Sequence, residues 1–113
     1  MLKKEFRNIE LSNGEKKLTV VFQDERYELL STLFFVDVRA FGDWIRQNIN
    51  DVLQGKACCR EISCNVCGLM IKKENTVVYD ILAEDGVGKQ CSLPTSELSA
   101  LIGEWDKAAS AKQ

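Results

Sequence analysis

The sequence predicts an α+β fold in which two helices pack on one face of a mostly antiparallel β-sheet. Strand-like segments joined by hairpin-length turns alternate with two amphipathic helical segments. Short links between strands require antiparallel pairing, and two helices on one sheet face is the simplest two-layer arrangement. The chain has 113 residues, of which 45% are hydrophobic and 28% charged, as expected for one globular domain spanning residues 1–113.

An opening β-meander is expected over residues 1–36. Asn13-Gly14 is a strong hairpin signal, because both central residues of a type I′ turn need positive φ. Apolar residues alternate with others over 18–23, which is the period of a half-buried strand. Residues 27–30 are predicted as a third strand, and the apolar residues 33–36 as the link to the first helix.

The first helix is expected over residues 37–55, with Asp37 as its N-cap and Gly55 at its end. Gly42 lies inside it and suggests close packing against the sheet. The apolar stripe of this helix comprises Val38, Phe41, Ile45, Ile49 and Val52. Polar and charged residues occupy the other face, as in an amphipathic helix.

A second β-meander is expected over residues 57–93, followed by a C-terminal helix over 95–109 with Thr95 as its cap. The predicted strands lie near 57–63, 67–73, 76–83 and 89–93. The final helix has a complete apolar stripe of Leu98, Leu101, Ile102 and Trp105. Trp44 and Trp105 both lie near helical stripes and are interpreted as core residues.

The composition excludes several classes of function. The chain has no histidine, so it lacks the usual general base and the commonest metal ligand. Its net charge of −2 offers no basic surface for phosphates, and no nucleic-acid partner is expected. The sequence has no signal peptide and no run of about 20 apolar residues, so we expect a cytoplasmic protein without a membrane partner.

Four of the five cysteines are crowded into residues 58–67. Cys64 and Cys67 flank a predicted turn and could bind one zinc ion, but two further ligands would have to come from Cys58, Cys59 or Cys91. A redox pair would need to begin a helix, whereas strand-like sequence follows Cys67. We therefore predict no metal and no cofactor. The alternative is a small cysteine-dependent zinc-binding or redox domain built on Cys64 and Cys67.

Carboxylates provide the other possible chemistry. Asp80, Glu84 and Asp85 lie close together in sequence, but nothing near them predicts a pocket that would raise the pKa of one carboxyl group. Residues 86–89, Gly-Val-Gly-Lys, lack the spacing of a phosphate-binding loop. No catalytic residue is predicted, and the chain is not expected to be an enzyme.

The one-domain layout and two helical segments resemble bacterial toxin immunity proteins, particularly those of contact-dependent growth inhibition. The segments are AFGDWIRQNINDVLQGK, residues 40–56, and LPTSELSALIGEWDKA, residues 93–108. The resemblance implies a cytosolic, non-enzymatic protein, monomeric or weakly dimeric. Its implied partner is the toxic C-terminal domain of a cognate effector, often a nuclease, whose active site or substrate surface it blocks.

An inhibitor of a basic nuclease is expected to present acidic groups where substrate phosphates would lie. Acidic residues outnumber basic ones only by 17 to 15, so such a surface has to be a local patch. The candidate toxin-binding residues are Asp80, Glu84 and Asp85 on the late turn, and Asp43 and Asp51 on the polar face of the first helix.

Overall fold

The computed structural model describes residues 3–83 and 89–110 and confirms the α+β fold class. Its strands are β1 (Lys4–Glu10), β2 (Lys16–Phe22), β3 (Cys59–Ser63), β4 (Cys67–Lys72), β5 (Asn75–Asp80) and β6 (Gln90–Pro94). Its helical segments are η1 (Glu25–Tyr27), α1 (Glu28–Thr32), the π-helical η2 (Leu33–Val38), α2 (Arg39–Leu53) and α3 (Thr95–Ser110). The segments from η1 to α2 follow one another without a break.

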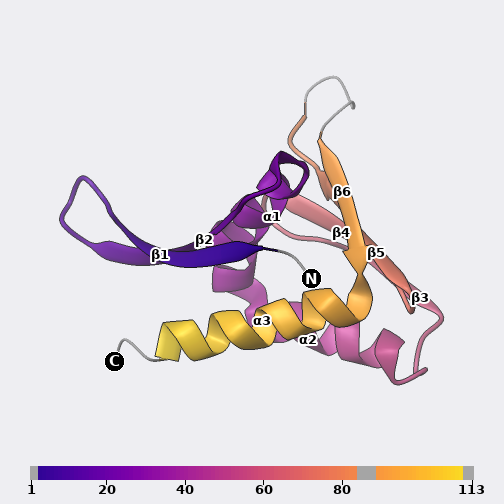
Figure 1. The fold of residues 1–113 in the computed structure, drawn as a ribbon. Helices are drawn as coiled ribbons and strands as arrows, with labels where there is room; N and C mark the ends of the chain where they lie inside the picture. Colours follow the sequence, from indigo (N-terminus) through magenta and orange to yellow (C-terminus); the bar gives the residue numbers. More distant parts are fainter. Residues whose placement is uncertain (1–2, 84–88, 111–113) are drawn as a thin grey trace.

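The strands form two sheets where one was expected. β1 and β2 pair with each other as an antiparallel hairpin, and β3, β4, β5 and β6 form a four-stranded antiparallel meander in chain order. Figure 1 shows the hairpin projecting away from the larger sheet. Leu18, Val20 and Phe22 on its inner face are buried in the shared core, which holds the base of the hairpin against the helices.

The hairpin at Asn13-Gly14 is confirmed, but its turn is not the expected type I′ turn. Gly14 has a φ of +86°, and no non-glycine residue in the described ranges has positive φ, so Asn13 does not adopt the left-handed conformation. The Asn13 side chain instead accepts a hydrogen bond from the backbone N–H of Glu15 at 3.0 Å. The connection is thus a longer loop over residues 11–15, with one left-handed glycine.

The predicted third strand at residues 27–30 is wrong, because these residues are helical. Asp24 begins the helical region: its carboxylate accepts a hydrogen bond from the backbone N–H of Arg26 at 2.9 Å. The buried pairs Leu29 and Leu30, then Leu33 and Phe34, recur at a spacing of four, which is a helical period. Residues 33–36 are therefore part of the helix and not a link before it.

The start of the first helix at Asp37 is also wrong. Asp37 lies inside η2, fully buried, and caps no helix. Gly42 has no close sheet neighbour either, since a Cβ there would first meet the Val38 side chain at 3.7 Å. The predicted end is confirmed: α2 stops at Leu53, and Gly55 follows with a φ of +79°, the conformation that commonly terminates helices.

One face of the four-stranded sheet forms the core. Leu69 of β4 and Val78 of β5 are directly paired and fully buried, and the helices cover this face. On the outer face the Tyr79 ring lies directly over Gly68, where a Cβ would fall 2.3 Å from the ring. The Tyr79 hydroxyl donates to Glu61 at 2.7 Å, so a glycine in β4 makes room for a ring that bridges to β3.

The C-terminal helix is confirmed, and Thr95 is its first residue. Its hydroxyl is buried, lies 2.8 Å from the Thr76 hydroxyl, and donates to the Lys72 carbonyl. Thr95 therefore ties the start of α3 to the sheet. The stripe of α3 is buried, with Trp105 only 4% exposed. In the described part of the chain, none of the helices combines the length and hydrophobicity of a membrane span.

Candidate functional site

Asp37 joins the long helix to the β3–β4 turn. Its buried carboxylate accepts hydrogen bonds from the backbone N–H groups of Asn65, Val66 and Cys67, at distances between 2.8 and 3.3 Å. Successive N–H groups that point to one centre form a concave anion site, which the chain's own carboxylate fills here. The turn is consequently held at a fixed position beside the helix.

The long helix kinks at Phe41, shortly after η2. Phe41 has a φ of −128° and a ψ of 25°, outside the helical region. Irregular turns of this kind change which face of a helix a residue occupies. Phe41 therefore leaves the apolar stripe in which it was predicted and is 37% exposed. The carboxyl-terminal part of the stripe is unaffected, since Ile45 and Ile49 are fully buried.

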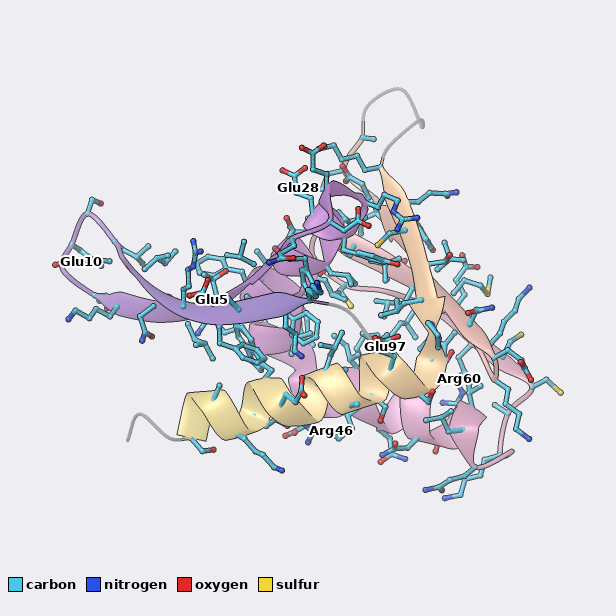
Figure 2. The ribbon with its side chains drawn as sticks, in the orientation of Figure 1. Glu5, Glu10, Glu28, Arg46, Arg60 and Glu97 are labelled. Carbon is cyan, nitrogen blue, oxygen red and sulfur yellow. The ribbon has the colours of Figure 1, made fainter. Side chains whose placement is uncertain are left out.

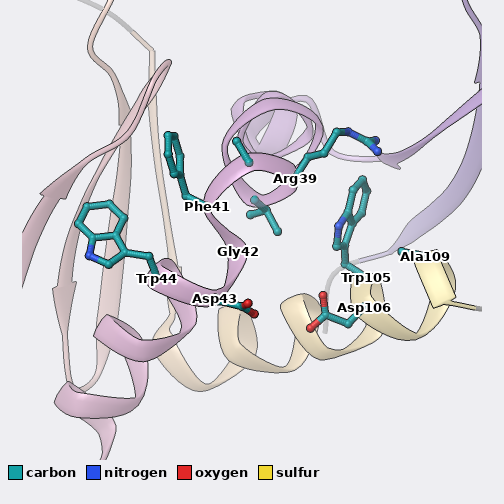
Figure 3. Close-up of a pocket in the computed structure, with 10 residues that line it drawn as sticks. Arg39, Phe41, Gly42, Asp43, Trp44, Trp105, Asp106 and Ala109 are labelled. Atoms are coloured by element: carbon teal, nitrogen blue, oxygen red, sulfur yellow. The ribbon is translucent and has the colours of Figure 1, made fainter.

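Trp44, predicted as a core residue, is the second exposed aromatic side chain at this kink. It is 48% exposed, and its ring lies 6.3 Å from the Phe41 ring at an interplanar angle of 73°. Figure 3 shows both rings on the same side of α2. We call this pair of residues, Phe41 and Trp44, the aromatic ridge.

A cleft of about 510 Å³ opens between the first half of α2 and the second half of α3, with the aromatic ridge contributing to its lining. Figure 3 shows Asp43 of α2 and Asp106 of α3 pointing toward one another across it. Arg46 forms an ion pair with Asp106 and lies 3.7 Å from the Asp43 carboxylate. On the opposite wall the Arg39 guanidinium lies 5.3 Å from the centroid of the Trp105 ring.

A second hollow of about 370 Å³ lies on the other side of the ridge. The ridge forms one wall, and Ser63, Cys64 and Asn65 of the β3–β4 turn form the other. Because Asp37 holds this turn, both walls are fixed to the same helix. The aromatic ridge thus separates two preformed hollows of the surface.

The structure gives the two predicted carboxylates of α2 different environments. The Asp43 side chain is fully exposed at the rim of the cleft. Asp51 is only 9% exposed; its carboxylate pairs with Arg60 of β3 at 3.1 Å and accepts a hydrogen bond from Gln47 at 2.9 Å. Asp51 therefore joins α2 to β3, while Asp43 is accessible to a partner.

Asp80 lies in another hollow, at the end of β5. Its carboxylate accepts a hydrogen bond from the backbone N–H of Leu82 at 2.8 Å. The same hollow is lined by Glu28 and Lys89, which form an ion pair at 3.1 Å. Glu84 and Asp85, the remaining predicted toxin-binding residues, lie outside the described residues. In the described ranges, the cleft and this hollow do not share a lining residue.

The cysteines are free thiols in contrasting environments. Cys58 and Cys59 are exposed, Cys64 is half-buried, and Cys67 and Cys91 are buried. Burial, reinforced by the charge of Asp37, raises the pKa of Cys64 to about 11 and that of Cys67 to about 12. A redox-active pair needs a lowered pKa, since the thiolate is the nucleophile. The environment of Cys64 and Cys67 raises the pKa of both thiols, which disfavours the reactive thiolate.

Side chains suited to metal binding are also dispersed. Across residues 3–83 and 89–110, no three cysteine, aspartate or glutamate side chains are grouped so that they could hold one metal ion. Asp37, the carboxylate nearest the Cys64–Cys67 turn in the hydrogen-bond network, is already occupied by backbone N–H groups. Cys67 belongs to the hydrophobic core, and Cys64 packs against that core.

Replacing Cys64 and Cys67 together with serine is expected to reduce the free energy of unfolding by about 1–3 kcal/mol, because hydroxyl groups replace apolar sulfur atoms in buried surroundings. Urea denaturation measures this loss, with the exposed pair Cys58→Ser, Cys59→Ser as the matched control. A chelator is expected to leave the wild-type unfolding curve unchanged. Unfolding by the chelator would instead reveal a structural metal.

The aromatic ridge was not predicted from the sequence. Periodicity alone places Phe41 on the buried stripe and Trp44 beside it, because it assumes one continuous α-helical register. The available signal was the helical spacing of the apolar residues between Leu29 and Val38, which places the start of the helix upstream of Asp37. Nothing in the sequence predicts that the Asp37 carboxylate is buried or that it accepts hydrogen bonds from the β3–β4 turn.

Comparison with known proteins identifies one informative relative. A protein from Bacillus cereus named immunity protein is 43% identical to this chain over 95 residues, which covers 84% of this chain and 79% of the relative. No protein-family model matches the chain, and no solved structure does.

Proposed function

Because the chain belongs to the same family as the Bacillus cereus immunity protein, we propose that it protects its cell by binding and neutralising a cognate protein toxin. The identity of 43% over most of both chains is the observation that carries this proposal. The chemistry of the chain agrees with inhibition by binding: it has no histidine, and its paired cysteines have raised pKa values. The protein acts as an inhibitor and not as an enzyme.

We further propose that the system is of the contact-dependent growth inhibition type. The partner is then the toxic C-terminal domain of an effector, a nuclease whose active site the immunity protein covers in the cytoplasm. The resemblance of residues 40–56 and 93–108 to such immunity proteins supports this assignment. A net charge of −2 is compatible with a partner that itself binds phosphates.

Two acidic regions are proposed to contact the toxin. The first is the late turn with Asp80, Glu84 and Asp85, and the second is the cleft rim with Asp43. Local carboxylates accelerate encounter with a basic partner and fix its orientation. Asp51, the other predicted residue, contributes by holding α2 against β3 through Arg60.

The double substitution Glu84→Lys, Asp85→Lys is expected to slow association with the toxin by about tenfold or more at low salt and to make the association rate less salt-sensitive. Stopped-flow association with an inactivated toxin domain measures the rate. Protection is measured by co-expressing the active toxin domain encoded beside the gene for this protein. The matched control is Glu10→Lys, Glu15→Lys at the tip of the β1–β2 hairpin, which adds the same charge elsewhere.

The two measurements test the late-turn interface and the proposed immunity function separately. Equal rates for the late-turn variant and the control would remove residues 84 and 85 from the interface. Failure of the wild-type protein to protect against the neighbouring toxin would contradict the proposed function itself.

A further inference from the structure

The aromatic ridge is the one place in the described ranges where large exposed hydrophobic side chains form a ring pair. The exposed large hydrophobic residues are Ile9, Val21, Phe41, Trp44 and Leu82. Isolated exposed hydrophobic residues are ordinary, but two contacting aromatic rings at the surface are costly unless something covers them. Only Phe41 and Trp44 in this set are aromatic, and their rings are arranged edge to face.

The ridge is held in its exposed position by the fold. The kink at Phe41 turns its ring out of the core, and Trp44 follows one helical turn later. The facing wall, the β3–β4 turn, is fixed by three N–H groups bound to Asp37. A partner entering the hollow beside the ridge therefore meets a rigid site, which lowers the entropic cost of binding.

Charged side chains of both signs lie beside the ridge, namely Asp43 and Asp106 with Arg39 and Arg46. Arg46 is engaged by Asp106, and its nearest atom to the Asp43 carboxylate is 3.7 Å away. Arg39 donates to the backbone carbonyls of Leu18 and Phe35, so its guanidinium is already bound. The Asp43 carboxylate is fully exposed and only loosely paired with Arg46 at 3.7 Å, so it can also pair with a cation of a partner.

We propose that the aromatic ridge and Asp43 form the anchor of the toxin interface. The complementary toxin surface carries an apolar side chain that fills the hollow between the ridge and the β3–β4 turn, beside a lysine or arginine that pairs with Asp43. This inference rests on the proposed function, because the partner is the toxin. Buried aromatic residues dominate the binding energy of interfaces, and charge pairs at their rim set orientation and association rate.

Removing the Trp44 side chain tests whether the aromatic ridge anchors the toxin interface. Trp44→Ala is expected to weaken binding to the inactivated toxin domain at least about 30-fold, as measured by titration calorimetry. Val21→Ala is the matched control, because Val21 is 38% exposed on the outer face of the hairpin, and it is expected to change Kd less than about twofold. Equal Kd values for wild type and Trp44→Ala would overturn the anchor and leave the proposed function standing.

The charge at the rim is tested separately. Asp43→Lys is expected to slow association about tenfold at low salt, while Glu10→Lys leaves it unchanged. Figure 2 shows Glu10 near the tip of the hairpin, remote from Arg46. An unchanged association rate for Asp43→Lys would remove the cation from the proposed toxin surface.

A measurement on the wild-type fold avoids any effect of the substitutions on folding. The chain has two tryptophans, so 5-fluorotryptophan labelling gives one fluorine resonance for exposed Trp44 and one for buried Trp105. Addition of unlabelled toxin domain is expected to shift the Trp44 resonance, which Trp44→Phe assigns by its loss. If the complex forms and this resonance stays in place, the anchor is wrong. If no complex forms, the proposed function fails with it.

Discussion

Replacing Asp37 with alanine is expected to lower the free energy of unfolding by about 3–5 kcal/mol. The carboxylate is fully buried and accepts hydrogen bonds from three backbone N–H groups of the β3–β4 turn. The Cys67 N–H group is buried and those of Asn65 and Val66 are partly buried. A buried N–H group left without an acceptor costs about 1–3 kcal/mol, part of which is offset because a charge no longer has to be buried.

Urea denaturation followed by circular dichroism measures this loss. Asp43→Ala is the matched control, since the same substitution at a fully exposed carboxylate is expected to change stability by about 0.5 kcal/mol or less. A loss below about 1 kcal/mol for Asp37→Ala would mean that the turn does not depend on this carboxylate.

Replacing Phe34 with alanine is expected to cost about 3–5 kcal/mol, as for other large buried aromatic residues. Phe34 is 1% exposed, and its ring lies 5.6 Å from that of Trp105. It therefore packs η2 against α3, and its removal leaves a cavity where helices and hairpin meet. Thermal and urea unfolding measure the loss.

Phe41→Ala provides the matched comparison for Phe34. Both substitutions remove the same atoms, but Phe41 is 37% exposed and its ring lies edge-on to that of Trp44. We expect its cost to be at most about half that of Phe34→Ala. Equal losses would contradict the assignment of Phe34 to the core and of Phe41 to the surface.

The parts of the fold that depend on local pattern were predictable from the sequence. The hairpin at Asn13-Gly14, the four strands of the second meander and the buried stripe of α3 all follow from the period of apolar residues and from turn residues. Gly55 likewise ends α2 with the positive φ that its residue type favours. In these segments local preference and tertiary packing agree.

The errors arise where tertiary structure changes a local pattern. Residues 27–30 were predicted as a strand from a weak alternation of polar and apolar residues. The cap at Asp24 and the helical spacing of apolar residues through Val38 favour a helix instead. The π-helical turn then shifts the register, so the side chain of Phe41 faces solvent. A continuous 3.6-residue period cannot anticipate such a shift.

The candidate site was predicted only in part for the same reason. Asp43 was correctly placed on the polar face of the first helix, because exposed charges follow helical periodicity. Asp51 was placed there too, yet its burial depends on the distant Arg60 of β3. The partner of Asp37 is also distant in sequence, so neither carboxylate could be assigned from its neighbours along the chain.

The most direct test of the account is a titration of toxin activity with this protein. The purified toxic domain encoded beside its gene is held at a concentration well above Kd, and the wild-type protein is added in increasing ratio. The account predicts that activity falls linearly and vanishes at one equivalent, because each inhibitor molecule occupies one toxin molecule. Full toxin activity in the presence of excess protein, with no complex on gel filtration, would contradict it.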